Sequence, residues 1–492
     1  MTDLSHHTSS TLKKNALGTA GIVFLVLAAV APLTGIVVVA GLAMALGNGG
    51  GSAASFFTVA IILLIFSVGY AQMSRELVNA GGFYAFVVKG LGRTGGLIAG
   101  LIAAIGYNFF VVGTIGTSGF FMQTIIADLT GLDVHWYVWG LASIIASFFM
   151  ARRGVDFSSK ILGIALILEV GLLVVFDIAV LIQTGYSFEA FSPAAVFSGS
   201  FPIGLLIAAT GFLGFEATAL FGEEAKQPLK TIPRATYSAI IAIGLILGLT
   251  TWAVVSAIGV AETQGVAAEH LADGDLLFGL AEQYVGPTYL TIMLILLLVS
   301  LFAAMLAFHN SATRYLYSLG RARILPPVLA RTGSNGTPVT AGLVQAGFAA
   351  LVAFVFMLAG ANPMEAIVPP MLGFGTLSII DLQTLAALSI LVHFRRAKSP
   401  KILTTFVAPL ISFLLLGTIV VMAIANFDIV AGSDAQTIRL LPWLLAITAV
   451  GGLIYGAWLK ANRPNIYAGL ADDLEQFDPR RAPEAPSPVT ET

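Results

Sequence analysis

Three ionisable residues lie inside apolar segments of the chain, where an ionisable group is costly and usually serves a function. Glu216 lies in "GFLGFEATALFG", Glu169 in "ALILEVGLLVVF" and His309 in "AFHNSATR". Carboxyl and imidazole groups in such places can take up and release protons. For the two glutamates the alternative is a structural hydrogen bond to a neighbouring helix. For His309 it is packing beside Asn310, which the sequence favours slightly.

Covalent chemistry finds little support in the sequence. The chain has no cysteine, which excludes disulfides, thiolate catalysis and cysteine-based metal sites. No His/Asp cluster has metal-ligand spacing, and no Ser/Lys or paired-Asp arrangement lies on facing segments. We therefore expect no enzymatic activity, no cofactor and no metal site.

The composition is that of a protein embedded in lipid. Of the 492 residues 57% are hydrophobic and 10% are charged, whereas soluble domains carry about 25% charged residues. The apolar runs 53–70, 161–182 and 289–308 approach or exceed the ~20 residues with which a helix spans a bilayer. The sequence predicts an all-α polytopic membrane protein whose surroundings are the lipid bilayer, with no nucleic-acid partner.

Glycine, proline and charged residues divide the chain into about twelve expected transmembrane helices. They are expected near 17–46, 52–75, 95–128, 135–151, 159–183, 201–222, 232–261, 286–319, 338–360, 365–393, 403–424 and 438–460.

Charge orients these spans in the plasma (inner) membrane. With both termini cytoplasmic, all of the 24 Lys and Arg residues except Arg439 fall on the cytoplasmic side, as the positive-inside rule requires. The segments at the two ends, 1–16 and 471–492, are predicted cytoplasmic tails, and the second is Pro-rich and acidic, which is typical of disorder. The sequence does not distinguish a monomer from a homodimer.

Two of the spans carry helix-breaking residues near their middle. Pro32 in span 1 has no N–H and leaves the carbonyl of Ala28 without its helical partner. In span 6, Gly211 and Gly214 stand on either side of Phe212. Spans 1 and 6 begin two five-helix halves, 17–183 and 201–393, with 403–460 as two added spans. Interruptions at matching places in two halves predict a transporter site in a 5+5 inverted repeat with discontinuous helices 1 and 6.

Three motifs resemble a known family in their correct order. "GYAQMSRELVNAGGFYAFVVKGLG" (69–92), "GFEATALFGEEAKQPLKTIPRA" (214–235) and "ATRYLYSLGRARILPPVLARTGSNGTPVTA" (312–341) resemble signatures of the amino acid–polyamine–organocation (APC) transporter superfamily. With the twelve spans, the resemblance covers nearly the whole chain. It implies a LeuT-type fold and alternating-access transport of amino acids or related amines.

The chain departs from the family pattern at three places. Pro32-Leu33-Thr34 stands where the family has Gly-Ser/Thr-Gly, the run that binds the substrate carboxylate. Thr210 stands where many members have an aromatic outer gate, a role that Phe212 or Phe215 could fill. Glu169 stands where several members carry a lysine near the site at which related transporters hold sodium.

The predicted substrate site combines the two breaks with two polar residues of span 3. Free N–H groups after each break carry the positive end of a half-helix dipole and can bind a carboxylate, and free carbonyl groups before each break can bind an ammonium group. The predicted substrate-binding residues are Ala31, Pro32, Leu33, Thr34, Gly35, Tyr107, Asn108, Thr210, Gly211, Phe212, Gly214 and Phe215. Glu216, Glu169 and His309 are the predicted coupling or gating residues.

The sequence thus predicts a secondary active transporter of a small amino acid or related amine, coupled to protons or working by exchange. Span 8 lacks adjacent hydroxyl residues at mid-depth, which disfavours sodium coupling. One alternative is a carboxylate-free amine (a polyamine, ethanolamine or an imidazole-like base), which the altered span 1 motif favours, although few acidic residues are available for a polyamine. The other is a non-transporting sensor, which would normally carry a sizeable soluble domain.

Overall fold

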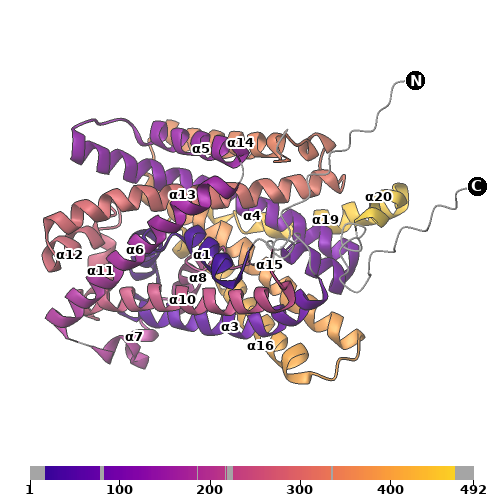
Figure 1. Cartoon of the computed structure of the whole chain (residues 1–492), viewed down its shortest axis with the longest axis horizontal. Helices are drawn as coiled ribbons and strands as arrows, with labels where there is room; N and C mark the ends of the chain where they lie inside the picture. The colour runs from indigo at the N-terminus through magenta and orange to yellow at the C-terminus, as the bar shows by residue number, and fades with distance from the viewer. Residues whose placement is uncertain are drawn as a thin grey trace, which may run out of the picture.

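The computed structural model is a bundle of helices, most of which run side by side along its longest axis (Figure 1). It describes residues 17–77, 82–153, 155–185, 187–216, 218, 225–333 and 336–470, except for the side chains of 153–162. The predicted tails 1–16 and 471–492, and most of span 6 beyond residue 216, lie outside the described residues.

The first part of the chain contains two interrupted helices and four long ones. Its elements are α1 (Thr19–Val30), α2 (Pro32–Thr34), the π-helices η1 (Gly35–Ala40) and η2 (Ala43–Asn48), the 3₁₀-helix η3 (Gly49–Gly51), α3 (Ser52–Glu76), α4 (Gly82–Thr130), α5 (Trp136–Arg153), α6 (Val155–Thr184), η4 (Phe188–Phe191), α7 (Pro193–Val196) and α8 (Phe201–Thr210).

The second part has longer continuous helices with short ones between them. They are α10 (Pro228–Ile258), α11 (Thr263–Glu269), α12 (Leu276–Tyr284), α13 (Pro287–Arg321), η5 (Pro327–Ala330), α14 (Val339–Leu358), η6 (Pro363–Ile367), α15 (Val368–Arg396), η7 (Leu403–Val407), α16 (Ala408–Ala425), α17 (Phe427–Ala431), α18 (Gln436–Arg439), α19 (Trp443–Asn462) and α20 (Pro464–Gly469). In the described parts, β-pairing is limited to one isolated bridge, Leu17 with Ala225.

Nine helical stretches within the described ranges are long and apolar enough to cross a bilayer. They are Thr19–Glu76, Gly82–Thr130, Gly163–Thr184, Pro228–Ile258, Pro287–Arg321, Val339–Leu358, Pro363–Arg396, Leu403–Ala425 and Trp443–Asn462. The first contains both α1 and α3, while α5 and the short α8 are additional to the nine. The prediction of an all-helical, multi-pass membrane protein is confirmed.

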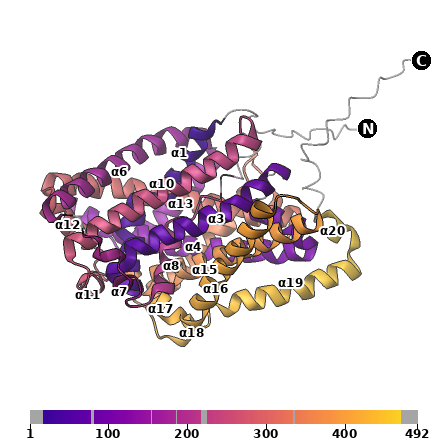
Figure 2. The same ribbon diagram turned by 90° about the horizontal axis from the view of Figure 1, so that it is seen from below.

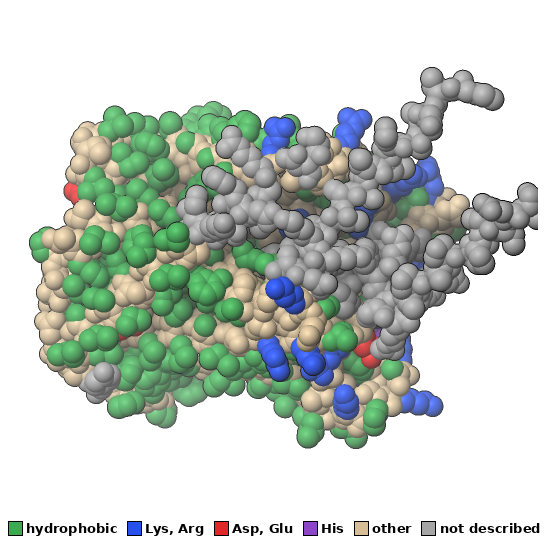
Figure 3. Space-filling model, in the orientation of Figure 1, with side chains coloured by type: hydrophobic (Ala, Val, Ile, Leu, Met, Phe, Trp, Pro, Cys, Tyr) green, Lys and Arg blue, Asp and Glu red, His purple; other side chains and the backbone are tan. Residues whose placement is uncertain are grey.

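The outer surface is apolar, as contact with lipid requires. Side chains such as Ile182, Leu358 and Ile454 are 74%, 68% and 66% exposed. Exposure of so much apolar area is unfavourable in water but not in contact with lipid. Figure 3 shows many hydrophobic side chains on the visible face, with Lys and Arg gathered toward one end of the long axis. Figure 2 shows α16 and α19 on one side of the bundle and α6 on the opposite side.

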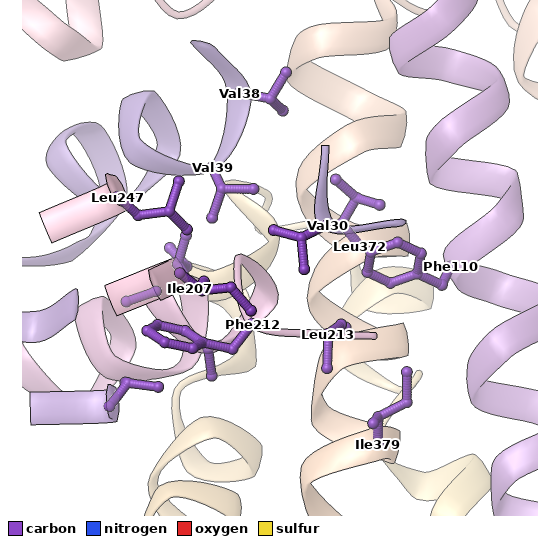
Figure 4. Close-up of a cluster of buried hydrophobic side chains, with 14 of the residues drawn as sticks. Val30, Val38, Val39, Phe110, Ile207, Phe212, Leu213, Leu247, Leu372 and Ile379 are labelled. Atoms are coloured by element: carbon purple, nitrogen blue, oxygen red, sulfur yellow. The ribbon is translucent and has the colours of Figure 1, made fainter. Parts of the chain in front are cut away.

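Close helix packing fixes the centre of the bundle. A Cβ atom on Gly106 of α4 would lie 2.4 Å from the Cβ of Ser378 on α15, so only glycine allows the two backbones to approach this closely. The next residues of α4, Tyr107 and Asn108, are thereby held in the core. Figure 4 shows the apolar side chains that converge there, among them Val30 of α1, Phe110 of α4 and Leu372 of α15.

Candidate functional site: two broken helices around a cavity

The first break lies at Ala31, between α1 and α2. Ala31 has φ 51° and ψ 73°, a left-handed conformation that interrupts the right-handed helix. Pro32 then starts the new helix, which continues through η1, and its ring leaves no N–H to donate. Gly35 donates its N–H to the carbonyl of Ala31 at 3.0 Å. The free main-chain donors at this helix start are therefore those of Leu33 and Thr34.

Both of these donors are bound by side chains from distant helices. The N–H of Leu33 donates to Glu169 Oε2 of α6 at 3.2 Å, and the N–H of Thr34 donates to Ser300 Oγ of α13 at 3.2 Å. The Thr34 hydroxyl also donates to Ser300 Oγ at 3.0 Å, and the Ser300 hydroxyl donates to Glu169 Oε2 at 2.8 Å. The Glu169 carboxyl group, 2% exposed, thus accepts hydrogen bonds from the break directly and through Ser300.

The second break occupies residues 211–216, directly after α8. Gly211, Phe212 and Leu213 donate their N–H groups to carbonyls three residues back, in a tightened last turn. Gly214 then takes φ 111°, a backbone conformation that residues with a side chain rarely adopt. Its N–H donates to Glu216 Oε2 at 2.9 Å.

Glu216 also joins the break to α4. The hydroxyl of Tyr107 donates to Glu216 Oε1, and the Tyr107 ring stacks on Tyr315 of α13 with 5.2 Å between the ring centroids. The carboxyl group is buried, at 6% exposed. Each break therefore has one intramembrane glutamate bound to one of its main-chain N–H groups.

A small cavity, with a volume of about 40 Å³, lies between the two breaks. It is lined mainly by apolar side chains with a few hydroxyl groups: Val30, Thr34, Gly35, Val38, Val39, Phe110, Thr114, Thr117, Ser118, Thr210, Gly211, Leu213, Leu301, Ala304, Phe308 and Leu372. The lining contains no ionisable side chain. Val30, Phe110, Leu213 and Leu372 are among the side chains drawn in Figure 4.

Four of the predicted substrate-binding residues line this cavity. They are Thr34, Gly35, Thr210 and Gly211. The others lie around it, outside its lining: Ala31, Pro32, Leu33, Tyr107, Asn108, Phe212, Gly214 and Phe215. The Asn108 side chain, for example, donates to the Ala104 carbonyl of its own helix at 2.7 Å. Phe212 is fully buried in the core around Leu247.

Four residues of α4 line the cavity although they are not among the residues predicted from the sequence. Phe110, Thr114, Thr117 and Ser118 follow Tyr107 by 3, 7, 10 and 11 residues, which is the repeat of one helix face. All four line the cavity. The signal was available as hydroxyl residues at helical spacing in an otherwise apolar span.

His309 lies away from both breaks. Its Nδ1 is hydrogen-bonded to Gln345 Oε1 of α14. The side chain lines a different cavity, between α5, α13 and α14, together with Arg152 and Pro338. Within the described ranges, no three His, Asp or Glu side chains come together as metal ligands.

Two further sets of contacts lie near residues that line the cavity. The hydroxyls of Thr210 and Thr376 are 2.8 Å apart, which ties the end of α8 to α15. Phe215, beyond the second break, packs edge-on against Phe66 of α3 and Phe83 of α4, with ring centroids 6.3 and 6.5 Å apart. Tyr70 extends this aromatic cluster at 5.8 Å from Phe83.

Comparison with known proteins matches this architecture to one family. A family described as amino acid permease matches residues 17–452. A branched-chain amino acid permease of Lactococcus lactis is 25% identical over 63% of this chain and 70% of its own length. A branched-chain amino acid permease of Bacillus subtilis is 24% identical over 76% and 80% of the two chains, and a methylthioribose transporter of Bacillus subtilis is 26% identical over 77% and 80%. The chain belongs to the amino acid permease family of the APC superfamily and is an amino acid transporter.

Proposed function

We propose that this protein is a secondary active transporter that carries a small amino acid with an apolar side chain, by alternating access, together with protons. The observation that carries the proposal is the central cavity. It lies between the two helix breaks, and its lining offers hydroxyl groups and apolar surface but no charged side chain. Such a lining suits an aliphatic side chain, because burying it removes apolar area from water at no polar cost.

The relatives support a branched-chain cargo. Two of the similar proteins are named as branched-chain amino acid permeases, and Phe110, Leu301 and Leu372 offer the kind of surface that a leucine, isoleucine or valine side chain would contact. The amino acid's ammonium and carboxylate groups would bind the main chain at the two breaks.

In the proposed architecture the protein crosses the plasma membrane twelve times, and both termini are cytoplasmic. Counting α1 with η1, and α3, as separate spans, and adding α5 and the interrupted span that begins with α8, brings the nine long stretches to twelve. The two breaks then stand at the start of two five-helix halves, 17–183 and 201–393, related as inverted repeats. The Lys- and Arg-rich end of the molecule in Figure 3 is the proposed cytoplasmic end.

The two glutamates are the proposed coupling groups. Each is buried and holds a main-chain N–H group of a break, so gain or loss of its proton changes the bonding of that break. His309 lies in another cavity, and we assign it the packing role beside α14. The Thr210–Thr376 contact and the aromatic cluster around Phe215 are the proposed barriers on the two sides of the cargo.

The test is flux into liposomes that contain the purified protein. We expect saturable uptake of labelled leucine, isoleucine or valine, stimulated by an inward proton gradient and abolished by a proton ionophore. Counterflow should occur without any gradient. Binding without uptake or counterflow would instead indicate a sensor.

A second cargo class is favoured by one observation. The two free donors of the first break already bind Glu169 and Ser300, which leaves a cargo carboxylate no free donor at that break. A carboxylate-free amine or neutral compound would not need them, and one similar protein is named as a methylthioribose transporter. Isoamylamine is leucine without its carboxylate. If the protein transports isoamylamine but not leucine, this second class is supported.

Glu216 has its own test in the same assay. A Glu216→Gln variant keeps an oxygen for the Gly214 N–H but cannot ionise, so we expect slower uptake with a flattened pH profile. Uptake with an unaltered pH profile would remove Glu216 from the coupling mechanism.

A further inference from the structure

We infer that the carboxylate of Glu169 is an internal competitor for the carboxylate of the cargo, so that an amino acid binds only as Glu169 takes up a proton. This inference rests on the proposed function and adds to it the order of events at the site and the number of protons bound with each cargo molecule.

The first break has few donors, and all of them can be accounted for. Pro32 has no N–H, Gly35 is bonded to Ala31, and the N–H groups of Leu33 and Thr34 end on Glu169 and Ser300. A carboxylate that docks at this helix start must therefore replace bonds that the chain already makes. Thr34 and Gly35 also line the cavity, so this helix start is within reach of a bound cargo.

Glu169 is well placed to occupy the position of a cargo carboxylate. Its Oε2 accepts from the Leu33 N–H and the Ser300 hydroxyl, the kind of donors that an amino acid carboxylate would use. Two carboxylates at one helix start would repel each other strongly in a buried site. Protonation of Glu169 removes this repulsion and weakens the hydrogen bond that the carboxyl group accepts from the Leu33 N–H.

Among the described residues, no other ionisable side chain contacts the Glu169 carboxyl group. The described contacts of the Glu169 carboxyl group are the neutral donors of Leu33 and Ser300. Charged and titratable residues on α6 and on the helices packed against it make other contacts or lie elsewhere along those helices. Asp177 of α6 accepts from Thr250, Tyr289 of α13 donates to the Leu172 carbonyl, His309 of α13 bonds Gln345, Tyr315 of α13 stacks on Tyr107, and Arg152 of α5 lies over the Phe148 ring. The others are Lys230, Arg234 and Tyr237 near the start of α10, Arg314, Tyr317 and Arg321 near the end of α13, and Glu282 and Tyr284 of α12. The short helices α1 and α2 carry no titratable side chain.

Linkage gives the sign of the effect. Because a bound cargo carboxylate favours the neutral form of Glu169, the protein takes up a proton when the cargo binds, and the affinity for the cargo falls as the pH rises. Above the midpoint, one linked proton weakens binding by about tenfold per pH unit. A cargo without a carboxylate leaves Glu169 in place and binds with little pH dependence.

The experiment measures leucine binding to the purified full-length protein by calorimetry from pH 5.5 to 8.5. Proton uptake is obtained by repeating the titration in buffers of different ionisation enthalpy. For the wild-type protein we expect about one proton taken up per leucine bound at high pH. For isoamylamine, binding should be accompanied by no such uptake.

Three variants separate the inference from its alternatives. Glu169→Gln should bind leucine with no linked proton and a flat pH profile, whereas Glu216→Gln should keep the linked proton of the binding step. Ser300→Ala removes a donor that favours the charged carboxylate, so the midpoint of its affinity profile should move to higher pH. If Glu169→Gln loses its cooperative thermal transition, the shifted midpoint of Ser300→Ala, which retains Glu169, tests the inference in its place.

The outcomes are distinct. A pH-independent affinity of the wild-type protein for leucine, or a linked proton that persists in Glu169→Gln, would overturn the inference and leave the transport function intact. Failure of leucine, isoleucine and valine to bind at any pH to the folded protein would overturn the proposed cargo and the inference together.

Discussion

At each helix break a main-chain N–H group donates to a glutamate, but the two glutamates come from different parts of the chain. At the second break the acceptor is local, because Glu216 lies two residues beyond the Gly214 N–H that it binds. At the first break the acceptor comes from another helix, because Glu169 of α6 is 136 residues away from Leu33 in the chain. A local acceptor moves with its own segment. A distant one ties the break to α6 and α13, so movement of those helices would disrupt the main-chain bonds of the first break, whereas the Gly214–Glu216 bond depends on no other helix.

The backbone conformations of the breaks predict the largest effect. Gly214→Ala should reduce uptake by about 10- to 100-fold, since φ 111° is open to glycine and costs other residues about 1–3 kcal/mol. The added methyl group itself has room, with Ala29 Cβ at 3.7 Å, so the effect comes from the backbone. Uptake rates and the thermal midpoint report it.

Ala31→Gly is the matched control at the first break. Glycine relieves the left-handed φ of 51° but loses a buried methyl group and gains freedom in the unfolded chain, so the net change should stay below about 1 kcal/mol. Equal losses in the two variants would mean that the breaks do not differ in backbone strain.

A second prediction concerns the cavity that the two breaks share. Ala304→Leu on α13 adds three carbon atoms to the cavity beside Phe308 and should weaken leucine binding by at least about tenfold, or about 1.4 kcal/mol. Ala446→Leu adds the same atoms on the exposed side of α19 and should leave binding unchanged. Unaltered leucine affinity in Ala304→Leu would place the cargo outside this cavity.

The third prediction tests the link between the second break and α4. Tyr107→Phe keeps the ring that stacks on Tyr315 but removes the hydroxyl that donates to Glu216, a bond to a carboxyl group worth about 1.5–3 kcal/mol. We expect uptake to fall by about tenfold. Tyr137→Phe also removes one hydroxyl, which donates to the Ala350 carbonyl at the edge of the bundle, and serves as the control. A comparable loss of uptake in both variants would show that the Glu216 contact has no special role.

The positions of the two breaks could be predicted from the sequence, because each follows from the covalent structure of a single residue type. Pro32 interrupts a span because it has no N–H, and Gly214 adopts a positive φ because it has no Cβ, so both positions can be recognised without a structure. Membrane insertion and the permease family also follow from local patterns and motifs, and both are confirmed.

The acceptors at the breaks could not be predicted in the same way. The Glu169–Leu33 and Thr34–Ser300 bonds depend on how α6 and α13 pack against α2, which no local pattern specifies. The cavity-lining face of α4 depends on the rotation of that helix about its axis, which the close approach of Gly106 to α15 determines. The predicted residue Tyr107 lies on the same helix as the lining residues Thr114 and Thr117, about two and three turns before them.

The smallest expected effect is at the contact between the Thr210 and Thr376 hydroxyls. Thr210→Val keeps the shape of the side chain and removes one hydrogen bond, which is worth about 1 kcal/mol. If this contact closes one side of the cavity after the second break, the variant should open that side more often and exchange leucine a few-fold faster in counterflow. Thr376→Val should have the same effect. The double variant should add nothing further, because each single substitution already removes the same hydrogen bond. Additive effects in this cycle would mean that the two hydroxyls act separately, and their contact would then not close the cavity beside the second break.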